Sequence, residues 1–483
     1  ALPILQRDLG ASAQQVQWVV EGYSLFLAAL LLTGGALGDI FGRRLVYGLG
    51  IALFALASVA CGLAPSANTL IAARCIQGIG GALATPGSLA LLAANFEGEA
   101  RGRAIGTWSG FSAITAAIGP LLGGWLVQSL SWRAVFFINL PIAVVVLAIL
   151  ATRVDESRNP NASHRVDYAG ATFATLGLAL LVYGLIGLQS GASRLLDLGI
   201  ALLGAVTLGA FVFFESRIAE PMMRLELFRS RTFAIANLYT LFLYAALGGS
   251  LYFLPFELID VQGYSPAAAG AALLPFILIM FVASRWSGGL VARIGARTPL
   301  VIGALVAGAG FAGFAFAGIG RPYWLSFFFP AVILGAGGAL FVAPLTTAVM
   351  DAVERERSGL ASGINNTVSR AAGLLAIALL GVALASTFSS HIQSSLAASV
   401  GVSSATRTIA DAHRAALLAG HIPPSIANGE QRAIVAQAIA RSYHAGFVVV
   451  MLVAAGLCGV AAFVAFAFPS STRPRRRTAS RPV

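Results

Sequence analysis

Long apolar stretches recur along the whole of this sequence, and they limit the folds open to it more than any other feature. Each is close to twenty residues long, the length at which an α-helix crosses about 30 Å of hydrocarbon. With 58% hydrophobic and 10% charged residues, the chain lacks the polar surface of a soluble domain. We therefore expect an all-α polytopic membrane protein. Thirteen stretches meet this description, near residues 17–37, 45–64, 70–93, 105–127, 134–152, 169–188, 195–214, 233–256, 267–292, 299–319, 324–349, 359–386 and 445–468.

The charges of the chain follow its loops. All 31 basic residues are arginine. When the loops are assigned alternately to two sides, twenty arginines fall on one side, and the short loops of the other side hold four. Cytoplasmic loops carry the excess of basic residues, so the arginine-rich side and the C-terminal tail are expected in the cytoplasm. Topology thus explains the net charge of +12, and we expect no nucleic-acid partner.

An internal repeat divides the chain into two halves. The residues Gly35, Gly42 and Arg44 recur as glycine, glycine and arginine 253 residues later. The two copies are eight spans apart, and an even number gives them the same orientation, as in a parallel repeat about an axis along the membrane normal. Two six-span halves with two inserted spans between them account for this spacing.

The expected organisation, in chain order, is an N-terminal bundle, a cytoplasmic connector, two inserted spans, a second cytoplasmic connector, a C-terminal bundle with one long outer loop, and a basic cytoplasmic tail. The boundaries are 1–152, 153–168, 169–214, 215–231, 232–468 (with the outer loop at 387–444) and 469–483. Residues Ala1 to Leu5 read like the end of an apolar helix, so the first span of the N-terminal bundle is expected to be mostly absent.

A charged loop, Gly38-Asp39-Ile40-Phe41-Gly42-Arg43-Arg44, joins the first two stretches. So short a loop makes the flanking helices antiparallel neighbours. It places one carboxylate and two guanidiniums at their junction, where they can pair with each other or with helix ends. Glycines let the backbones approach closely. We interpret Gly38, Asp39, Gly42, Arg43 and Arg44 as a latch that holds in one conformation and opens in another.

Arg74 lies inside the stretch 70–93. An arginine within hydrocarbon is costly unless it faces a cavity or a partner, so it indicates a functional site. Gln77 lies one turn away on the same helix face. The alternative is an arginine that snorkels to the outer interface with no further role.

The stretch 105–127 contains Gly119, Pro120, Gly123 and Gly124. Proline removes one backbone hydrogen bond and kinks a helix, and the flanking glycines allow it to bend against a partner. We expect this helix to act as a hinge or a seal between the two halves.

Together, the Asp39 loop, the Arg74 segment and the Gly119–Pro120 segment resemble the three signature motifs of drug:proton antiporters in the major facilitator superfamily. Segment 131–141 is similar to the start of the sixth span in its fourteen-span, EmrB/QacA-like branch, and the segments 263–266 and 361–367 are further matches. The resemblance runs in order from residue 1 to about 468. It implies two six-helix bundles plus two inserted spans, a central cavity, alternating access by rocking, and a place in the bacterial cytoplasmic membrane.

By that resemblance the Asp39 loop latches the cytoplasmic side in the outward-facing state, and Arg74 lies near the proton route. The Gly119–Pro120 helix would favour exchange over leak. Two departures stand out. The first span, which carries an acidic motif in the family, is not in this chain, and Ala292 stands where the second copy of Asp39 would be. The latch of the second half is therefore expected to be weaker.

Few acidic residues lie near the membrane. Glu21 is inside the stretch 17–37, and Glu257 and Asp260 follow a Leu-Pro break at the outer end of another stretch. A carboxyl group that binds protons near neutral pH needs an apolar setting without a nearby arginine. These three residues, with Arg74 and Gln77, are the candidates for proton coupling. A solvated carboxylate is the alternative for Glu257 and Asp260, and a pair between Glu21 and Arg74 stays open.

Amphipathic aromatic, amide and guanidinium side chains within spans are candidates for the cavity, because they suit lipophilic ligands that carry a polar group. Packing against lipid or other helices is the alternative for each aromatic. The candidates are Trp18, Tyr23, Phe111, Asn139, Tyr239, Tyr244, Asn365, Arg285 and Arg370.

No group of histidine, cysteine and acidic residues has metal-binding spacing, and the sequence holds no P-loop or nucleophile elbow. We therefore expect no cofactor and no enzyme activity, which leaves the proton gradient as the energy source. The predicted function is a proton-coupled antiporter that exports small amphiphilic molecules, as in multidrug efflux. The alternatives are an exporter of one endogenous metabolite or peptide-like compound and a non-transporting membrane sensor. An outer accessory protein stays open as a partner.

Overall fold

The computed structural model describes residues 2–95, 115, 118–158, 166–189, 193–218, 220–353, 358–399, 402–426 and 428–469. Within these ranges the chain forms helices and loops, and none of it is a strand. Twelve of the described helices are long and apolar enough to cross a membrane. They coincide with twelve of the thirteen predicted stretches, which confirms the all-α membrane fold. Most of the thirteenth stretch, 105–127, lies outside the described residues.

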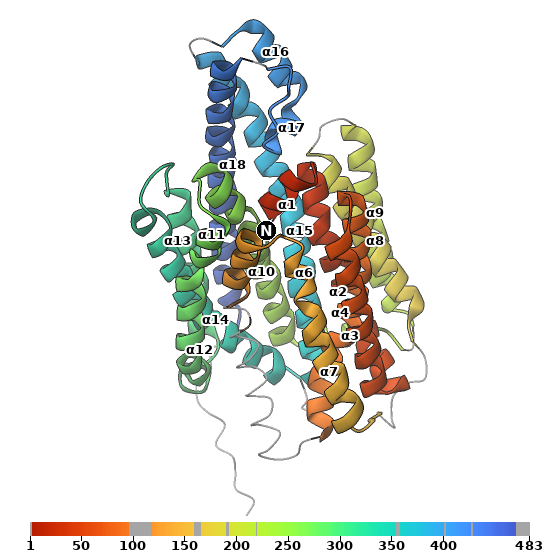
Figure 1. Cartoon of the computed structure of the whole chain (residues 1–483). Helices are drawn as coiled ribbons and strands as arrows, with labels where there is room; N and C mark the ends of the chain where they lie inside the picture. The colour runs from red at the N-terminus through yellow and green to blue at the C-terminus, as the bar shows by residue number, and fades with distance from the viewer. Residues whose placement is uncertain are drawn as a thin grey trace, which may run out of the picture.

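The first half, residues 2–158, is built around α4. Both α2 and α3 pack along α4, and α7 packs on α3 (Figure 1). The elements are α1 (Leu2–Asp8), α2 (Ala13–Phe41), α3 (Arg43–Leu63), α4 (Ala67–Asn95), a helical segment 118–129, α6 (Ala134–Phe137) and α7 (Asn139–Arg153).

The second half, residues 220–469, encloses the largest core. Buried aromatic side chains such as Phe311 and Phe447 fill the space between α10, α13, α14, α15 and α18. The elements are η1 (Leu225–Arg229), α10 (Arg231–Phe256), η2 (Glu257–Val261), α11 (Pro266–Ala271), α12 (Leu274–Ile294), α13 (Arg297–Ala315), η3 (Trp324–Phe328), α14 (Phe329–Asp351), α15 (Ser358–Ala398), α16 (Ser404–Ala412), α17 (Arg414–Leu418) and α18 (Gly429–Ala465).

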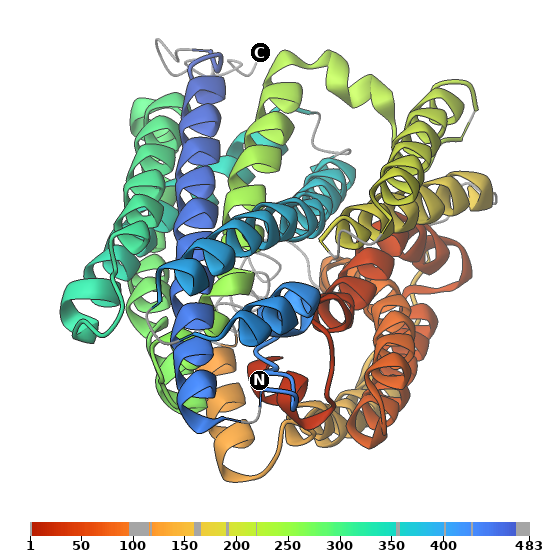
Figure 2. The same cartoon turned by 90° about the horizontal axis from the view of Figure 1, so that it is seen from above.

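In the sequence, two helices lie between the halves, α8 (Tyr168–Gly187) and α9 (Arg194–Glu215), and they pack closely on each other. Figure 2 shows this pair beside the first half, with α15 crossing the middle of the molecule. Contacts of α8 reach both α2 and α15. The inserted pair is therefore not isolated at the edge, because it touches both halves where they meet.

Carboxylates bind the backbone where the chain enters α8 and where it leaves α9. Asp167 caps α8 by accepting a hydrogen bond from the Gly170 N–H at 2.7 Å. Glu215 is 2% exposed and accepts a hydrogen bond from the Met223 N–H at 2.8 Å. The sequence analysis placed Glu215 in a surface connector, whereas in the structure it is the buried last residue of α9. It fixes the chain that leads into the second half.

The long helices α15 and α18 run well past their apolar stretches. Helix α15 extends to Ala398, and α18 begins at Gly429. The short helices α16 and α17 lie between them in the sequence. Much of the segment 387–444 is thus helical, and it rises above the bundle in Figure 1. We call this end of the molecule, which also carries α1, the cap end. The opposite end, with the Gly38–Arg44 loop, is the arginine end.

Helices in the first half meet through small residues. A Cβ atom built on Gly34 of α2 would fall on the carbonyl oxygen of Ala82 in α4 and 3.2 Å from the Cα atom of Leu83. The neighbouring Gly35 is different, because a Cβ atom there would lie 3.5 Å from Pro86 in ordinary contact. Close backbone approach of this kind replaces the hydrophobic effect as the source of helix association in lipid.

This difference gives a matched test of the packing. Gly34→Ala should destabilise the protein by about 1–3 kcal/mol, because the added methyl group forces α2 away from α4. Gly35→Ala should be neutral or slightly stabilising, since alanine favours a helix more than glycine. Thermal unfolding of both variants in detergent checks the prediction. Equal unfolding temperatures would contradict it.

Candidate functional site

The Gly38–Arg44 loop forms ionic contacts within the first half. Arg43 Nη2 and Nε lie 2.8 Å and 2.9 Å from Asp39 Oδ1, one helical turn away. Arg44 donates from Nη2 to the Ala151 carbonyl oxygen of α7 at 3.0 Å. Among the described residues, the hydrogen-bond and ion-pair partners of this loop all belong to the first half. The predicted pairing of its carboxylate and guanidinium is therefore formed.

Glu156 holds the same loop from the segment that follows α7. Its carboxylate accepts hydrogen bonds from the backbone N–H groups of Arg44 and Leu45, at 2.9 Å and 3.1 Å, at the start of α3. An anion is favoured there by the helix dipole. Gly42 makes room for it, because its φ is +124° and a Cβ atom would collide with the carboxylate. The sequence analysis missed Glu156.

Arg74 of α4 is held by a polar network inside the first half. Its Nε atom donates to the Val19 carbonyl oxygen at 2.9 Å, and its Nη1 atom donates to the Gln77 side chain. Gln77 in turn donates to Ser58 Oγ at 2.6 Å. Asn139, predicted as a cavity residue, donates to the same hydroxyl at 3.4 Å. The network joins α2, α3, α4 and α7, and its arginine has no carboxylate among its described partners.

Glu21 of α2 is fully buried. Its Oε1 atom accepts a hydrogen bond from Gln17 Nε2 at 2.7 Å, and Gln17 accepts one from Gln189 Nε2 at 2.8 Å. Its Oε2 atom has no hydrogen-bond partner among the described residues. The possible pair between Glu21 and Arg74 does not form, because Arg74 bonds to Val19 and Gln77 instead.

Two of the predicted cavity aromatics lie on α2. The guanidinium carbon of Arg74 stands 4.3 Å from the centre of the Tyr23 ring, in a cation–π contact. Trp18 packs against Tyr183 of α8, with ring centres 6.2 Å apart. Tyr23 therefore supports the arginine, and Trp18 anchors the inserted pair.

The other aromatic and amide candidates lie in the second half. Tyr239 is fully buried and donates to the Leu300 carbonyl oxygen at 2.8 Å. Asn365 of α15 donates to Thr240 Oγ1 at 2.7 Å. Tyr244 is half-buried against the core. The cavity prediction is wrong for Tyr239, because its ring and its hydroxyl are both used inside the bundle.

Arg370 of α15 is the remaining described candidate. It has no hydrogen bond or ion pair among the described residues, and its Nε atom is buried. Tyr23 of α2 lies within electrostatic range of it. Arg370 is thus an unpaired cation at the contact between the two halves. Phe111 and the side chain of Arg285 lie outside the described part of the structure.

The helical segment 118–129 meets the second half at α11. A Cβ atom on Gly124 would fall on the Pro266 carbonyl oxygen and 3.0 Å from the Cα atom of Ala267, whereas Gly119 and Gly123 have nothing within 4 Å. In the same way, a Cβ atom on Gly270 of α11 would fall on the Pro120 carbonyl oxygen. Pro120 and Gly124 thus face the other half, and the other two glycines do not.

Helix α1 bridges the two halves at the cap end. Asp8 accepts hydrogen bonds from Trp132 Nε1 at 2.6 Å and from Arg133 Nη1 at 3.0 Å. These two bonds lower the pKa of Asp8. On the other side, Arg7 forms an ion pair with Asp260 of η2. Asp260, predicted as a proton-coupling residue, therefore has a cationic partner from the first half.

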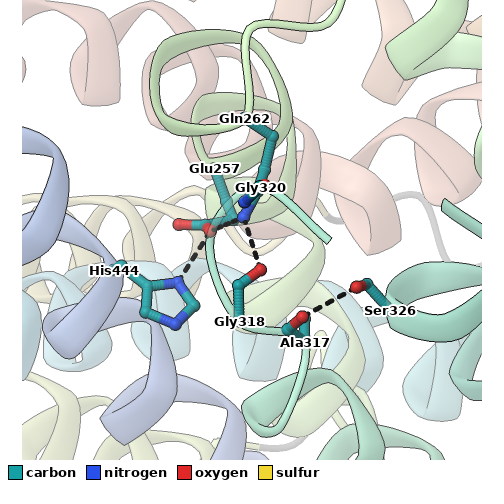
Figure 3. Close-up of polar contacts among 7 residues, drawn as sticks. All are labelled: Glu257, Gln262, Ala317, Gly318, Gly320, Ser326 and His444. Atoms are coloured by element: carbon teal, nitrogen blue, oxygen red, sulfur yellow. Dashed lines mark hydrogen bonds and ion pairs between the residues drawn. The ribbon is translucent and has the colours of Figure 1, made fainter. Parts of the chain in front are cut away.

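Glu257 begins η2, a π-helical turn that follows Pro255 in α10. Figure 3 shows its carboxylate between His444 of α18 and Gln262. Oε1 lies 2.8 Å from His444 Nδ1 and 2.9 Å from Gln262 Nε2. The alternative of a solvated carboxylate does not apply, because the Glu257 side chain is 0% exposed. His444 was not among the residues predicted from the sequence.

A small cavity of about 40 Å³ lies at the cap end. Residues from both halves and from the inserted pair line it, among them Gln17, Gln189, Tyr252 and Tyr443. It has room for about three water molecules, at roughly 10–15 Å³ each. A drug-sized ligand does not fit there in this arrangement of the helices.

Comparison with known proteins places this geometry in a family. The family model described as Major Facilitator Superfamily matches residues 1–377. The multidrug resistance protein Stp of Mycobacterium tuberculosis is 36% identical over 405 residues, which cover 81% of this chain and 73% of that protein. The tetracenomycin C resistance and export protein of Streptomyces glaucescens is 35% identical over 392 residues, which cover 80% of this chain and 72% of that protein.

Solved structures share the fold at lower identity. A bacterial homologue of the human lysosomal transporter Spinster gives a TM-score of 0.58 at 15% identity, covering 94% of this chain and 97% of that one. The D-xylose–proton symporter gives 0.54 at 16% identity, covering 77% of this chain and 80% of that one. At such identities the likeness concerns the fold alone.

The contact between Gly124 and Pro266 can be tested against its neighbour. Gly124→Ala should lower the free energy of unfolding by about 1–3 kcal/mol, because the methyl group overpacks the joint between segment 118–129 and α11. Gly123→Ala is the matched control, since open space surrounds that position. Thermal unfolding in detergent distinguishes them. A Gly123→Ala variant that loses as much stability would show that helix propensity, not the joint, is being measured.

Proposed function

The chain belongs to the major facilitator superfamily, and we propose that it is a proton-coupled antiporter that exports small amphiphilic molecules across the bacterial cytoplasmic membrane by alternating access. The family and the named relatives make it a transporter rather than an enzyme. Export of drug-like compounds is supported by relatives whose names refer to multidrug resistance and to resistance against single antibiotics. Names that refer to one antibiotic also fit an exporter of a single dedicated compound. Transport measured with a panel of substrates separates this function from multidrug export.

The arginine end faces the cytoplasm in this proposal. Loops at that end carry the excess of arginine, including Arg43, Arg44 and Arg153, and cytoplasmic loops are the ones enriched in basic residues. The C-terminal tail is then cytoplasmic, and the cap end lies outside. We also assign the chain to the fourteen-span branch, since the α8–α9 pair stands between two groups of helices and a plan of two six-helix bundles has no place for it.

Glu21 carries the proton in this proposal, and one observation supports it most. A carboxyl group inside a membrane-spanning helix is fully buried, bonds to one neutral glutamine, and leaves its second oxygen without a partner among the described residues. A carboxylate anion in such a place is costly, whereas a neutral carboxylic acid is not. Gln17 links this group to the water-sized cavity, which provides a path for the proton.

The arrangement of contacts suits a transporter closed on the outside. The ion pair between the two halves lies at the cap end, where Arg7 pairs with Asp260, and Gln128 accepts there from the Ala267 N–H at 3.3 Å. In the proposed cycle these contacts break when the outer side opens. The Asp39 loop, whose described bonds remain in the first half, then latches the arginine end. Arg74 keeps α2 and α4 together through its hydrogen bond to the Val19 carbonyl oxygen.

Transport by the full-length protein in proteoliposomes tests the proposal. With a panel of lipophilic cations and neutral drugs, the wild type should couple substrate movement to proton flux in the opposite direction. Glu21→Gln, which mimics the protonated side chain, should lower substrate-driven proton flux at least about ten-fold and leave the unfolding temperature unchanged, because it keeps the bond to Gln17. Arg74→Ala should abolish transport and also destabilise the protein, since Gln77 loses its partner.

Glu226→Gln is the matched control, because Glu226 is an exposed carboxylate at the start of the second half. It should transport as the wild type does. Substrate movement without proton flux would overturn antiport but keep export. Coupled flux at the wild-type rate in Glu21→Gln would remove Glu21 from the proton route. No movement of any panel compound would favour one dedicated substrate, which a metabolite panel then tests.

A further inference from the structure

The pair of Glu257 and His444 is not used by the function proposed above. The two residues come from different helices, 187 positions apart in the sequence, and their side chains meet at 2.8 Å. Figure 3 shows the imidazole pointing from α18 at the carboxylate. The Glu257 side chain is 0% exposed and that of His444 is 17% exposed. One member is therefore sealed in the protein, and the other is partly exposed.

The carboxylate is incompletely bonded. Oε1 accepts from Gln262 Nε2 and lies against His444 Nδ1, whereas Oε2 is buried and has no hydrogen-bond partner among the described residues. Gln262 also donates to the Gly318 carbonyl oxygen at 3.2 Å and accepts from the Gly320 N–H at 3.0 Å. The glutamine is thus fixed by the loop between α13 and α14, so it cannot turn to serve the second oxygen.

We propose that Glu257 and His444 together form a proton-binding site in the second half, separate from Glu21, and that this site takes up and releases one proton during transport. The inference rests on the proposed function for its role in transport, but the existence of the site can be tested without transport. Its ligand is a proton from the outer solution, which reaches the buried carboxylate through the imidazole.

The chemistry balances with one proton. Oxygen and nitrogen can share a short contact only with a proton between them, so His444 Nδ1–H donates to Glu257 Oε1. In that state the pair carries one negative charge. A second proton, added at His444 Nε2, makes the pair neutral as carboxylate and imidazolium, or as carboxylic acid and imidazole. Removing net charge from a buried site is favourable, and imidazole takes up protons in the range between pH 5 and 8.

Other titratable and charged groups lie around the pair. Tyr443 and Tyr252 come from α18 and α10, and both line the adjacent cavity. Asp260 on η2 is neutralised by Arg7 of α1. Tyr264 leads into α11, which has no titratable residue, and Arg321 is exposed on the loop that Gln262 holds. Because Glu257 and Asp260 share the single π-helical turn η2, movement that breaks the Arg7 contact also moves the site.

The decisive measurement follows the histidine ring signals by NMR on protein labelled at its five histidines, in detergent, as the pH is changed. The signal absent from His444→Gln identifies His444. In Glu257→Gln the pH dependence of that signal should change, because the ring no longer shares its proton with a carboxylate. Glu430→Gln, an exposed carboxylate in the first turn of the same helix, is the control and should leave the midpoint unchanged.

Transport provides the second readout. In proteoliposomes loaded with ethidium, or with the best compound from the panel, His444→Gln and Glu257→Gln should each shift the pH dependence of the initial rate. The double variant should shift it no further, because both residues hold the same proton. His391→Gln, exposed on the cap, should follow the wild type.

The outcomes separate the claims. An unchanged midpoint in Glu257→Gln overturns the shared site, whatever transport shows. A shifted midpoint with wild-type pH dependence of transport in His444→Gln overturns its part in transport. Additive shifts in the double variant indicate two protons rather than one and also contradict the proposal. A wild type that moves no compound is a failure of the proposed function, and it leaves the NMR result standing.

Discussion

Inside a bilayer no water completes the hydrogen bonds of a buried polar group, and this constraint orders the polar residues of the whole chain. Several buried polar side chains are held by groups from other helices. Arg74 bonds to a backbone carbonyl of α2, and Gln77 passes the connection on to α3. Polar residues therefore act as joints between spans, whereas Glu21 and Glu257 each keep one carboxylate oxygen without a partner among the described residues.

The two kinds of joint have different mechanical properties. Glycine contacts such as Gly34 on Ala82 bring backbones together without any polar bond, and most of those described above lie within one half, with Gly124 on Pro266 the exception. Ion pairs such as Arg7 with Asp260 lie between the halves and are partly exposed. Bonds of the second kind cost little to break, since water replaces the partner. The halves can therefore be rigid inside and separable at their border.

Much of the fold could be predicted from the sequence, because crossing hydrocarbon requires a length and an apolarity that composition alone reveals. Hydropathy says less where that requirement stops. The turns of α15 and α18 beyond the apolar stretches are polar, so hydropathy does not show that they continue the spanning helices. Their helical structure depends on packing in the cap, which no local pattern expresses.

The candidate site was predictable to a smaller extent. Asp39 and Arg43 are one turn apart, and Arg74 and Gln77 lie three residues apart, so local spacing was sufficient to pair them. Glu156 lies 112 residues from the loop it caps, and no signal in the sequence connects them. Tyr239 was assigned to a cavity for the same reason, since its hydrogen-bond partner is 61 residues away.

One consequence concerns the inserted pair. Gln189, at the cap end of α8, bonds to Gln17 of α2 in the first half, and its amide lies over Gly381 of α15 in the second half, where any side chain would collide with it. In the proposed cycle the halves rock, and these two surfaces move relative to each other. Because Gln189 is bonded to Gln17 of α2, it moves with the first half, and its amide leaves the place that Gly381 provides on α15.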